Sequence, residues 1–495
     1  MKYSDSFTTS QRSLFADAYL RQFVAAQKHW QRRALDYSKR ELFVLAAMLT
    51  VVVSASVYLP LLGLGVVAAA AGILLVGVMV RYPLLWLSAV FVCLIWWFPQ
   101  KGANSEGISA VEYALVAFYL GGLALWFAIM LLIKRKRLLR NTGDMLLVST
   151  LVLSLATFVI AAVNEKSVFM GLREWLLFLF LLYYFPFREH ITTKRQLLQM
   201  GAVFCGAMLV VGGITLLMYL KASTNIMYAF EVFSSRMNSN NNMSVVVSIF
   251  GFIALLYAPT LRHKAAALFV AVFFTTITIV SFARAFIVAT VIGVVVVLLV
   301  FDAKRVVRFG VYAVAVAIVF VGGVSVVFKD RASIALTVIK NRISSTTEGV
   351  KDVSLQSRLA ESAVVLRLIA ENPLGGNGMG ADFHFHDPIN NWEARVKFIH
   401  NGYLFIAFKL GLPLLLLFYG WYLWYLGKSY GIARQAKEPF DRILALSVVG
   451  SLFALLLINL TSSIFETRDG FVVVSMLIAV SSVVEQRLAE REQAA

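Results

Sequence analysis

The sequence predicts an all-α, polytopic membrane protein with about fourteen transmembrane helices, and its composition and its spacing of apolar runs lead to that prediction. Of the 495 residues, 60% are hydrophobic and 15% are charged, whereas soluble proteins carry roughly 25% charged residues. Apolar runs of about 20 residues, the length that crosses a bilayer, recur along the chain. The class of soluble globular proteins is therefore excluded.

The predicted topology starts from a basic N-terminal segment without a signal-peptide pattern, which is expected to stay in the cytoplasm. Within it, Ser13–Tyr37 predicts an amphipathic helix at the membrane surface, with docking to a partner as the alternative. The predicted spans are 42–62, 64–80, 84–98, 113–133, 145–163, 168–185, 197–220, 242–260, 265–282, 285–301, 309–328, 402–426, 443–463 and 470–484. Most of the 45 Lys and Arg residues then fall in cytoplasmic segments, as the positive-inside rule requires.

The chain is thus expected to have five parts, with both termini in the cytoplasm. They are a cytoplasmic N-terminal segment, eleven helices, one large periplasmic loop with amphipathic helices, three further helices and a cytoplasmic tail, at 1–41, 42–328, 329–399, 400–484 and 485–495. The net charge of +18 suits anionic lipid headgroups or a phosphate-bearing substrate. Cys93 and Cys205 both lie in apolar runs, which leaves no disulfide framework and no Cys-based zinc site.

The length of the loop 329–399 makes it the segment where function is expected. Within it, Ser357–Glu371 predicts an amphipathic helix that lies on the membrane, with its apolar face formed by Leu359, Ala363, Leu366 and Ala370. Ser357 as the N-cap would place Arg358 in the first turn, where free backbone N–H groups favour an anion. Arg358 is therefore a candidate for binding phosphate, and snorkelling to lipid headgroups is the alternative.

Two further stretches of this loop have weaker chemical signals. Gly375–Gly380 is rich in glycine but lacks the Lys-Ser/Thr of a P-loop, which favours a tight turn that brings backbone close to a partner or ligand. Asp382, His384, His386 and Asp387 could ligate a metal, yet no further residue fixes a geometry. We interpret them as solvated loop residues and predict no metal and no cofactor.

Ionisable residues in or beside apolar spans are functional candidates because their burial is costly. Arg284 lies in a short turn between two spans, Arg173 with Glu174 begins the sixth span, and Lys409 lies about two turns into the twelfth. Arg236 lies in an outward polar stretch. His400 marks the point where the long loop re-enters the membrane. Since histidine ordinarily has a pKa of about 6.5, His400 could act as a general base, with headgroup binding or helix capping as the alternative.

The order of these motifs resembles the O-antigen ligase and O-antigen polymerase superfamily of polyprenyl diphosphate-glycan glycosyltransferases. The resemblance covers residues 236–411 and rests on five pieces. They are Arg236 to Asn242, Ser281-Phe-Ala-Arg284, Ser357-Arg358, Glu371 to Gly380 with its Pro-Leu-Gly-Gly-Asn-Gly stretch, and His400-Asn-Gly-Tyr-Leu404. The chain departs from the family pattern at Ala283, where a Ser is frequent, and at Lys409, where an acidic residue is common.

The resemblance implies an integral-membrane glycosyltransferase of the bacterial inner membrane that uses a polyprenyl (undecaprenyl) diphosphate-linked glycan as donor. It places Arg284 and Arg358 at the diphosphate and His400 as the base, without metal or nucleotide-sugar. Arg236, Arg173, Asn401 and Lys409 would be auxiliary residues. The expected partners are the donor, a glycan or lipid-glycan acceptor, the bilayer and other polysaccharide assembly proteins, and no nucleic acid.

Three reactions remain open at this stage. Polymerisation of a surface polysaccharide or exopolysaccharide is favoured, with inversion at the anomeric carbon. Ligation to a lipid A core or another acceptor is the first alternative. A lipid-linked oligosaccharide flippase is the second, although the sequence has neither the repeat symmetry nor the mid-membrane charges of a transporter.

Overall fold

The computed structural model describes residues 72, 75–96, 115–164, 167–223, 240–328, 353–387 and 391–494. Its contacts divide the chain into two units, Met1–Arg81 and Tyr82–Ala495. The described residues of the first unit are helical, and the account below concerns the second. The predicted helix Ser13–Tyr37 and the first predicted span lie outside the described residues, as does Arg236.

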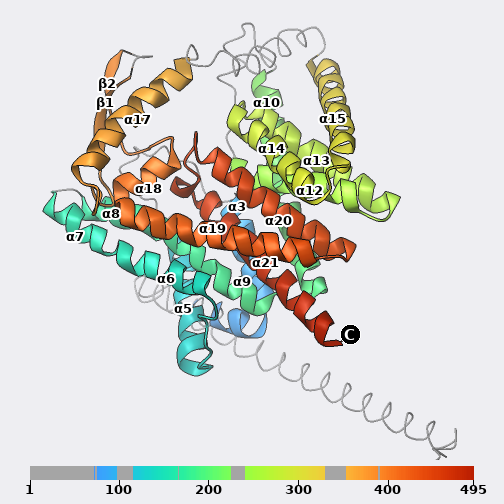
Figure 1. The fold of residues 1–495 in the computed structure, drawn as a ribbon, viewed down its shortest axis with the longest axis horizontal. Coiled ribbons are helices and arrows are strands. Elements are labelled where there is room, and N and C mark those ends of the chain that lie inside the picture. The colour runs from blue at the N-terminus through green and yellow to red at the C-terminus, as the bar shows by residue number, and fades with distance from the viewer. Residues whose placement is uncertain are drawn as a thin grey trace, which may run out of the picture. The chain divides into compact units, whose positions relative to one another are not determined.

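The second unit is built almost entirely of helices (Figure 1). Up to the middle of the chain they are α3 (Pro83–Trp96), η1 (Ala117–Gly121), α5 (Gly122–Ala128), η2 (Ile129–Ile133), α6 (Thr142–Ser154), α7 (Ala156–Val163), α8 (Val168–Phe178), η3 (Leu179–Tyr183), α9 (Tyr184–His190), α10 (Lys194–Ser223) and α12 (Asn241–Tyr257). The remaining elements are α13 (Leu261–Val280), α14 (Arg284–Phe301), α15 (Arg305–Phe328), α17 (Val353–Glu371), β1 (Phe383–Asp387), β2 (Trp392–Val396), α18 (Gly402–Leu410), α19 (Leu412–Gln435), α20 (Pro439–Ile458), η7 (Ile464–Glu466) and α21 (Arg468–Ala494).

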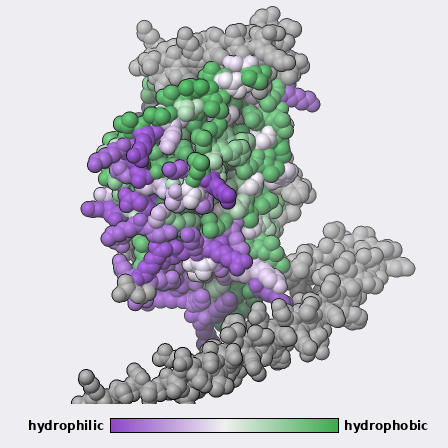
Figure 2. All heavy atoms as spheres, turned by 90° about the vertical axis from the view of Figure 1, so that its right-hand side faces the viewer, coloured by the Kyte–Doolittle hydropathy of each residue, from purple (hydrophilic) through white to green (hydrophobic). Residues whose placement is uncertain are grey.

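Eight helical segments of the described chain are long and apolar enough to cross a membrane. They are Thr142–Val163, Val168–His190, Lys194–Lys221, Leu261–Val280, Arg284–Phe301, Arg305–Gly323, Pro439–Ile458 and Arg468–Gln493. Hydrophobic side chains cover a broad area of the face shown in Figure 2, and hydrophilic ones gather below and to one side of it. The predicted class, an all-α membrane protein, is confirmed, and the number fourteen stays a prediction.

Helices α20 and α21 form the centre of the bundle. Two thirds of the apolar window of each is buried, compared with 39% or less in the other six segments. Small residues allow close helix contacts here: Gly293 of α14 lies against the backbone of Gly450 and the side chain of Ala454 in α20. Such positions leave no room for a larger side chain.

The predicted single span 402–426 is wrong in detail, because the helix breaks at Gly411 into α18 and α19. Gly411 has φ +83°, which a residue with a side chain rarely adopts, and a Cβ there would collide with the carbonyl of Leu374. Pro413 then lies in the first turn of α19, where its missing N–H costs nothing. The break turns α18 into a short helix that begins two residues after His400.

The long loop contains one described helix and a β-hairpin, whereas only amphipathic helices were predicted for it. Strands β1 and β2 pair antiparallel, with Phe383 opposite Val396 and Asp387 opposite Trp392. Phe383 and Phe385 are buried while His384 and His386 are exposed, so the strand has one inward and one outward face. This hairpin and α17 lie beside α18 and near α7 and α8 in Figure 1. We call this part of the molecule the loop end.

Candidate functional site at the loop end

His400 contacts both carboxylate oxygens of Glu361, a residue of α17. The Nδ1 atom of His400 lies 2.7 Å from Glu361 Oε2, and its backbone N–H donates to Oε1 at 2.8 Å. An ionised carboxylate can only accept, so Nδ1 is then the donor in this contact, and a neutral imidazole with that tautomer has its lone pair on Nε2. The Glu361 side chain is 3% exposed and that of His400 is 40% exposed. The arrangement is that of a base oriented by a buried acid.

A second acid holds the neighbouring backbone. The N–H of the buried Ile399 donates to Oε2 of Glu466, in the connection between α20 and α21, at 3.4 Å. Burial raises the pKa of Glu466 well above its ordinary value; Lys409 opposes this shift, and the carboxylates of Glu174 and Glu361 add to it. Glu466 therefore favours its neutral form, which costs less to hold in a poorly solvated place.

In the motif His400-Asn-Gly-Tyr-Leu404, each of the three residues after His400 makes a contact that explains its residue type. Asn401 caps α18, since its Oδ1 accepts from the backbone N–H groups of Tyr403 and Leu404 at 2.9 and 3.1 Å. Gly402 lies so close to Asn459 that a Cβ would overlap the Asn459 side chain. The Tyr403 hydroxyl donates to a backbone carbonyl of α20 at 3.0 Å. These contacts fix the start of α18 against the end of α20, and His400 with it.

The other end of α18 is fixed by a buried ion pair. Lys409 is fully buried, and its Nζ lies 3.0 and 2.9 Å from the two carboxylate oxygens of Glu174 and 2.6 Å from the carbonyl of Ala381. Glu174 also accepts from the N–H of Gly380 at 2.8 Å. Lys409 therefore joins α18, α8 and the glycine-rich turn, and it does not snorkel to the surface.

The glycine-rich turn packs against helices of the same chain. Gly376, Gly378 and Gly380 all have φ between +67° and +88°, a region that favours glycine. A Cβ at Gly378 would meet the backbone of Ala161 in α7, and one at Gly380 would meet the backbone of Gly171 in α8. The close backbone approach that the sequence predicts thus occurs, and it serves to dock the loop on the bundle.

Arg358 does not lie at the start of its helix, so this part of the prediction is wrong. Helix α17 begins at Val353, because the helical pattern extends one turn further than the Ser357 signal suggests. The Ser357 hydroxyl instead donates to Asp387 of the hairpin at 3.2 Å. Arg358 is therefore not close to the free backbone N–H groups of the helix N-terminus, which were the reason to expect an anion there. Arg358 nevertheless lies three residues before Glu361, a spacing that puts both side chains on neighbouring parts of one helix face.

Arg284 is the first residue of α14, after Ala283 and a strained Phe282 with φ +55°. Helices α14 and α20 run antiparallel, since Gly293 contacts Ala454 whereas the later Val297 contacts the earlier Gly450. Extended along both helices, this register places Arg284 level with the end of α20. That end contacts the start of α18, so Arg284 and His400 belong to the same end of the bundle.

The remaining predicted residues are less informative. Arg173 lies in α8, directly before Glu174. In the hairpin region Asp382 pairs with Arg395, with 2.7 Å between Oδ2 and an Nη atom, and Asp387 accepts from Ser357. Among the residues that the structure describes, no group of three His, Cys, Asp or Glu side chains could hold a metal ion.

Sequence reasoning missed Glu361, Glu466 and the partnership of Glu174 with Lys409. Glu361 had a usable signal, because it is an acidic residue opposite the apolar face of the predicted loop helix. Glu466 had a similar one, as a carboxylate in a short connection between two apolar runs. Their partners could not be identified, since they come from segments far apart in the sequence.

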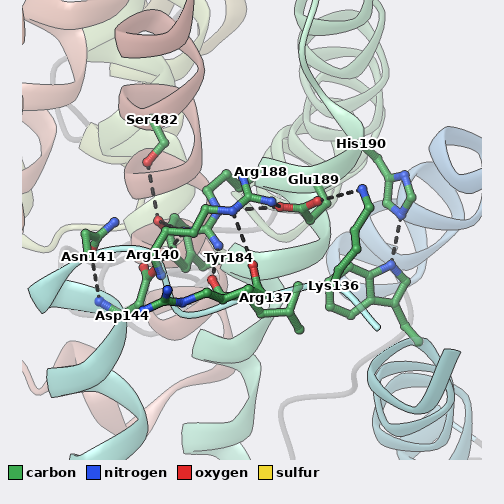
Figure 3. Close-up of polar contacts among 12 residues, drawn as sticks. Lys136, Arg137, Arg140, Asn141, Asp144, Tyr184, Arg188, Glu189, His190 and Ser482 are labelled. Atoms are coloured by element: carbon green, nitrogen blue, oxygen red, sulfur yellow. Dashed lines mark hydrogen bonds and ion pairs between the residues drawn. The ribbon is translucent and has the colours of Figure 1, made fainter. Parts of the chain in front are cut away.

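A second buried ionic cluster lies at the opposite end of the span Val168–His190 (Figure 3). Arg188 donates to Asp144 Oδ2 at 2.7 Å and to the Tyr184 hydroxyl at 2.8 Å, and both charged side chains are buried. The Tyr425 hydroxyl donates to the other oxygen of Asp144 at 2.8 Å. We call this the Arg188 cluster. It joins α6, α9 and α19 and leaves little of its charge to solvent.

Fold and site together define a multi-pass membrane protein with an oriented histidine and several arginines at one end of its bundle. Residues 269–419 match the family model described as O-antigen ligase. The matched segment contains Arg284, Arg358, Glu361, His400 and Lys409. This match over 269–419 supports the predicted resemblance to the O-antigen ligase and polymerase family. No curated protein matches the chain.

Proposed function

We propose that the chain is a glycosyltransferase that polymerises polyprenyl diphosphate-linked oligosaccharide units into a surface polysaccharide or exopolysaccharide. The observation that carries the proposal is the half-exposed imidazole of His400, oriented by Glu361 within the segment that matches O-antigen ligases. We place the reaction at the periplasmic face of a bacterial inner membrane, with both termini in the cytoplasm, because the charge pattern predicts that topology.

In this mechanism, Nε2 of His400 takes the proton of an acceptor hydroxyl. The acceptor oxygen forms a bond to the anomeric carbon as the bond from that carbon to the diphosphate oxygen breaks, and the electron pair leaves with the polyprenyl diphosphate. Attack from the face opposite the leaving group inverts the anomeric configuration. Glu361 keeps the proton on Nδ1 and stabilises the imidazolium that forms.

Arg284 and Arg358 would bind the diphosphate and stabilise the charge that develops on it. A fixed guanidinium has the geometry for phosphate oxygens and works best where water is scarce. Because two such cations serve the leaving group, we propose that the reaction needs no metal and no nucleotide cofactor. Arg236 and Arg173 would be auxiliary contacts to the glycan donor. The side-chain amide nitrogen of Asn401 would donate a hydrogen bond to the acceptor.

The test is transfer by the purified protein in nanodiscs, supplied with polyprenyl diphosphate glycan from its host. Released polyprenyl diphosphate and glycan length are measured for the wild type, Arg284→Ala, Arg358→Ala and His400→Ala. The matched control is His384→Ala, an exposed histidine of the same loop. A ladder of longer lipid-linked glycans that is lost in the three variants and kept in the control supports a polymerase.

Two other results would redirect the proposal. Transfer that requires a lipid A core or another added acceptor indicates a ligase, for which the family match supplies a specific reason. Movement of the lipid across proteoliposomes without any transfer indicates a flippase. Full activity of His400→Ala with both arginines intact would contradict the base role.

A further inference from the structure

Helix α17 is apolar on two opposite faces. Its inner face packs on the hairpin and α18 with the buried Val365 and Ile369, and Glu361 lies on the same side. On the other side, Leu359 and Leu366 are 50% and 54% exposed, and the same stripe includes the exposed Ala363 and Ala370. A loop helix surrounded by water would place polar residues there. The outer face is thus suited to a non-aqueous neighbour.

This outer stripe continues into the exposed surface of α19. Leu374, just beyond α17, is 77% exposed, and the N–H of Leu412 donates to the carbonyl of Pro373 at 2.8 Å. That bond joins the end of the loop helix to the beginning of α19. Along α19 the exposed leucines Leu412, Leu416 and Leu423 recur at intervals of four and seven, which places them on one face.

Helix α19 is not one of the eight segments that are long and apolar enough to cross a membrane, but it packs against three helices of those segments, α6, α20 and α21. We therefore infer that its exposed leucine face lies beside lipid. The opposite face of α19 is buried by large aromatic residues, among them Phe418, Tyr422 and Tyr425. The exposed leucines of α19 are thus linked to the outer stripe of α17 through the exposed Leu374 and the hydrogen bond between Leu412 and Pro373. Continuity with a lipid-facing surface favours bilayer hydrocarbon over any other cover for α17.

We propose that α17 lies in the bilayer interface on the loop side, with Leu359, Ala363, Leu366 and Ala370 immersed in hydrocarbon. The same helix then presents Glu361 from its opposite face to His400. Because a helix is about 10 Å across, the histidine is then held roughly one helix diameter from the immersed stripe, on the headgroup side of the interface. This last step rests on the proposed function, since it places the base where a lipid diphosphate would lie. The lipid contact itself does not depend on that function.

The experiment is site-directed spin labelling of the full chain in nanodiscs. Cys93 and Cys205 are replaced by serine, and single labels are placed by Leu366→Cys, Glu371→Cys and His384→Cys. Glu371 and His384 are exposed polar positions and provide the controls. The label at 366 is expected to relax faster with oxygen, which partitions into hydrocarbon, and to be shielded at least about fivefold from a water-soluble nickel chelate relative to the controls.

Three results would overturn the proposal. Equal nickel accessibility at 366 and 384 would show a water-exposed face. Spin–spin broadening at 366 that disappears when labelled chains are diluted with unlabelled ones would show a second copy instead. Shielding that appears after polyprenyl diphosphate is added, and is absent before, would assign the face to the donor's isoprenoid chain.

An activity comparison then separates this inference from the proposed function. Leu366→Glu should lower transfer about tenfold by lifting α17 from the interface, whereas Leu366→Phe should leave it unchanged. Lipid shielding at 366 in a chain without transfer activity supports the lipid contact and contradicts the proposed function. Transfer activity without shielding supports the function and contradicts the lipid contact.

Discussion

Two ionic contacts among the described residues, the Arg188 cluster and the Glu361–His400 pair at the loop end, use buried carboxylates in different ways. In the Arg188 cluster, the carboxylate of Asp144 receives Arg188 on one oxygen and Tyr425 on the other, and all three side chains are buried. At the loop end, Glu361 is equally buried, but its partner His400 has one engaged nitrogen and a side chain 40% exposed.

The difference shows what distinguishes a structural charge from a reactive one. A buried ion pair that is closed off from solvent resists change and presents no atom to a substrate. A buried acid that orients a partly exposed base leaves one atom available to a substrate. No hydrogen-bond partner of His400 Nε2 occurs among the described residues. This nitrogen is therefore the atom of the pair that can contact a substrate.

The largest effect is expected from breaking the Arg188 cluster. Arg188→Met should lower the free energy of unfolding by about 3–5 kcal/mol, because it leaves Asp144 buried without its cation. Transfer activity per folded molecule should stay near that of the wild type. Thermal unfolding in detergent, followed by tryptophan fluorescence, measures the first quantity. A strong loss of activity in the molecules that remain folded would contradict a purely structural role.

A similar loss is expected from Lys409→Met, with a different consequence for activity. Removal of the cation leaves Glu174 partly buried and releases α18 from the glycine-rich turn. We expect a loss of about 3 kcal/mol in stability and also slower transfer, because α18 carries His400 at its other end. The double exchange Glu174→Lys with Lys409→Glu should recover part of both. No recovery would mean that the contacts of Lys409 with Ala381, rather than the charge pair, position the helix.

The fold class and the histidine of the candidate site could be predicted from the sequence, because composition and charge spacing report directly on the membrane. The apolar runs lead to the all-α class, and the order of Arg284, Arg358 and His400 leads to the family. Local signals were also sufficient for the end of α17 at Glu371 and for the close approach of the glycine-rich turn.

The missed features depend on contacts between distant segments. The break at Gly411 follows from the approach of the loop near Leu374, and the apolar pattern of 402–426 continues through it. The early start of α17 frees Ser357 to bind Asp387, thirty positions away. The hairpin was the exception, since the alternation Phe383-His-Phe-His-Asp387 is a strand pattern that was available from the sequence.

A smaller effect, confined to activity, is expected from Glu361→Gln. The amide can still accept from the backbone N–H of His400, but it removes the negative charge that stabilises an imidazolium. Transfer should fall about 10- to 100-fold with little change in thermal stability. The fall should be seen in kcat rather than KM, and Glu361→Asp should recover part of it. A change in KM alone would make Glu361 a donor-binding residue instead.

The smallest effect concerns Glu466 and the pH dependence of stability. Its pKa is raised above its ordinary value by burial, so the folded state retains a proton that the unfolded state releases. The stability that this proton supplies is complete below a pH of about 4.3, the unfolded pKa, and is lost as pH rises toward the folded pKa. Between pH 5 and 8, the titration of Glu466 can lower the free energy of unfolding by at most about 1.4 kcal/mol per pH unit.

Glu466→Gln isolates that contribution, because glutamine keeps an oxygen for the N–H of Ile399 and cannot titrate. The wild type should therefore lose more thermal stability than the variant between pH 5 and 8, and the two should converge at the acid end. Equal pH profiles would mean that Glu466 is ionised in the folded protein. The loop end would then hold three charged carboxylates, those of Glu174, Glu361 and Glu466, near the single cation Lys409. The interpretation of Glu466 as a neutral acid near His400 would then be wrong.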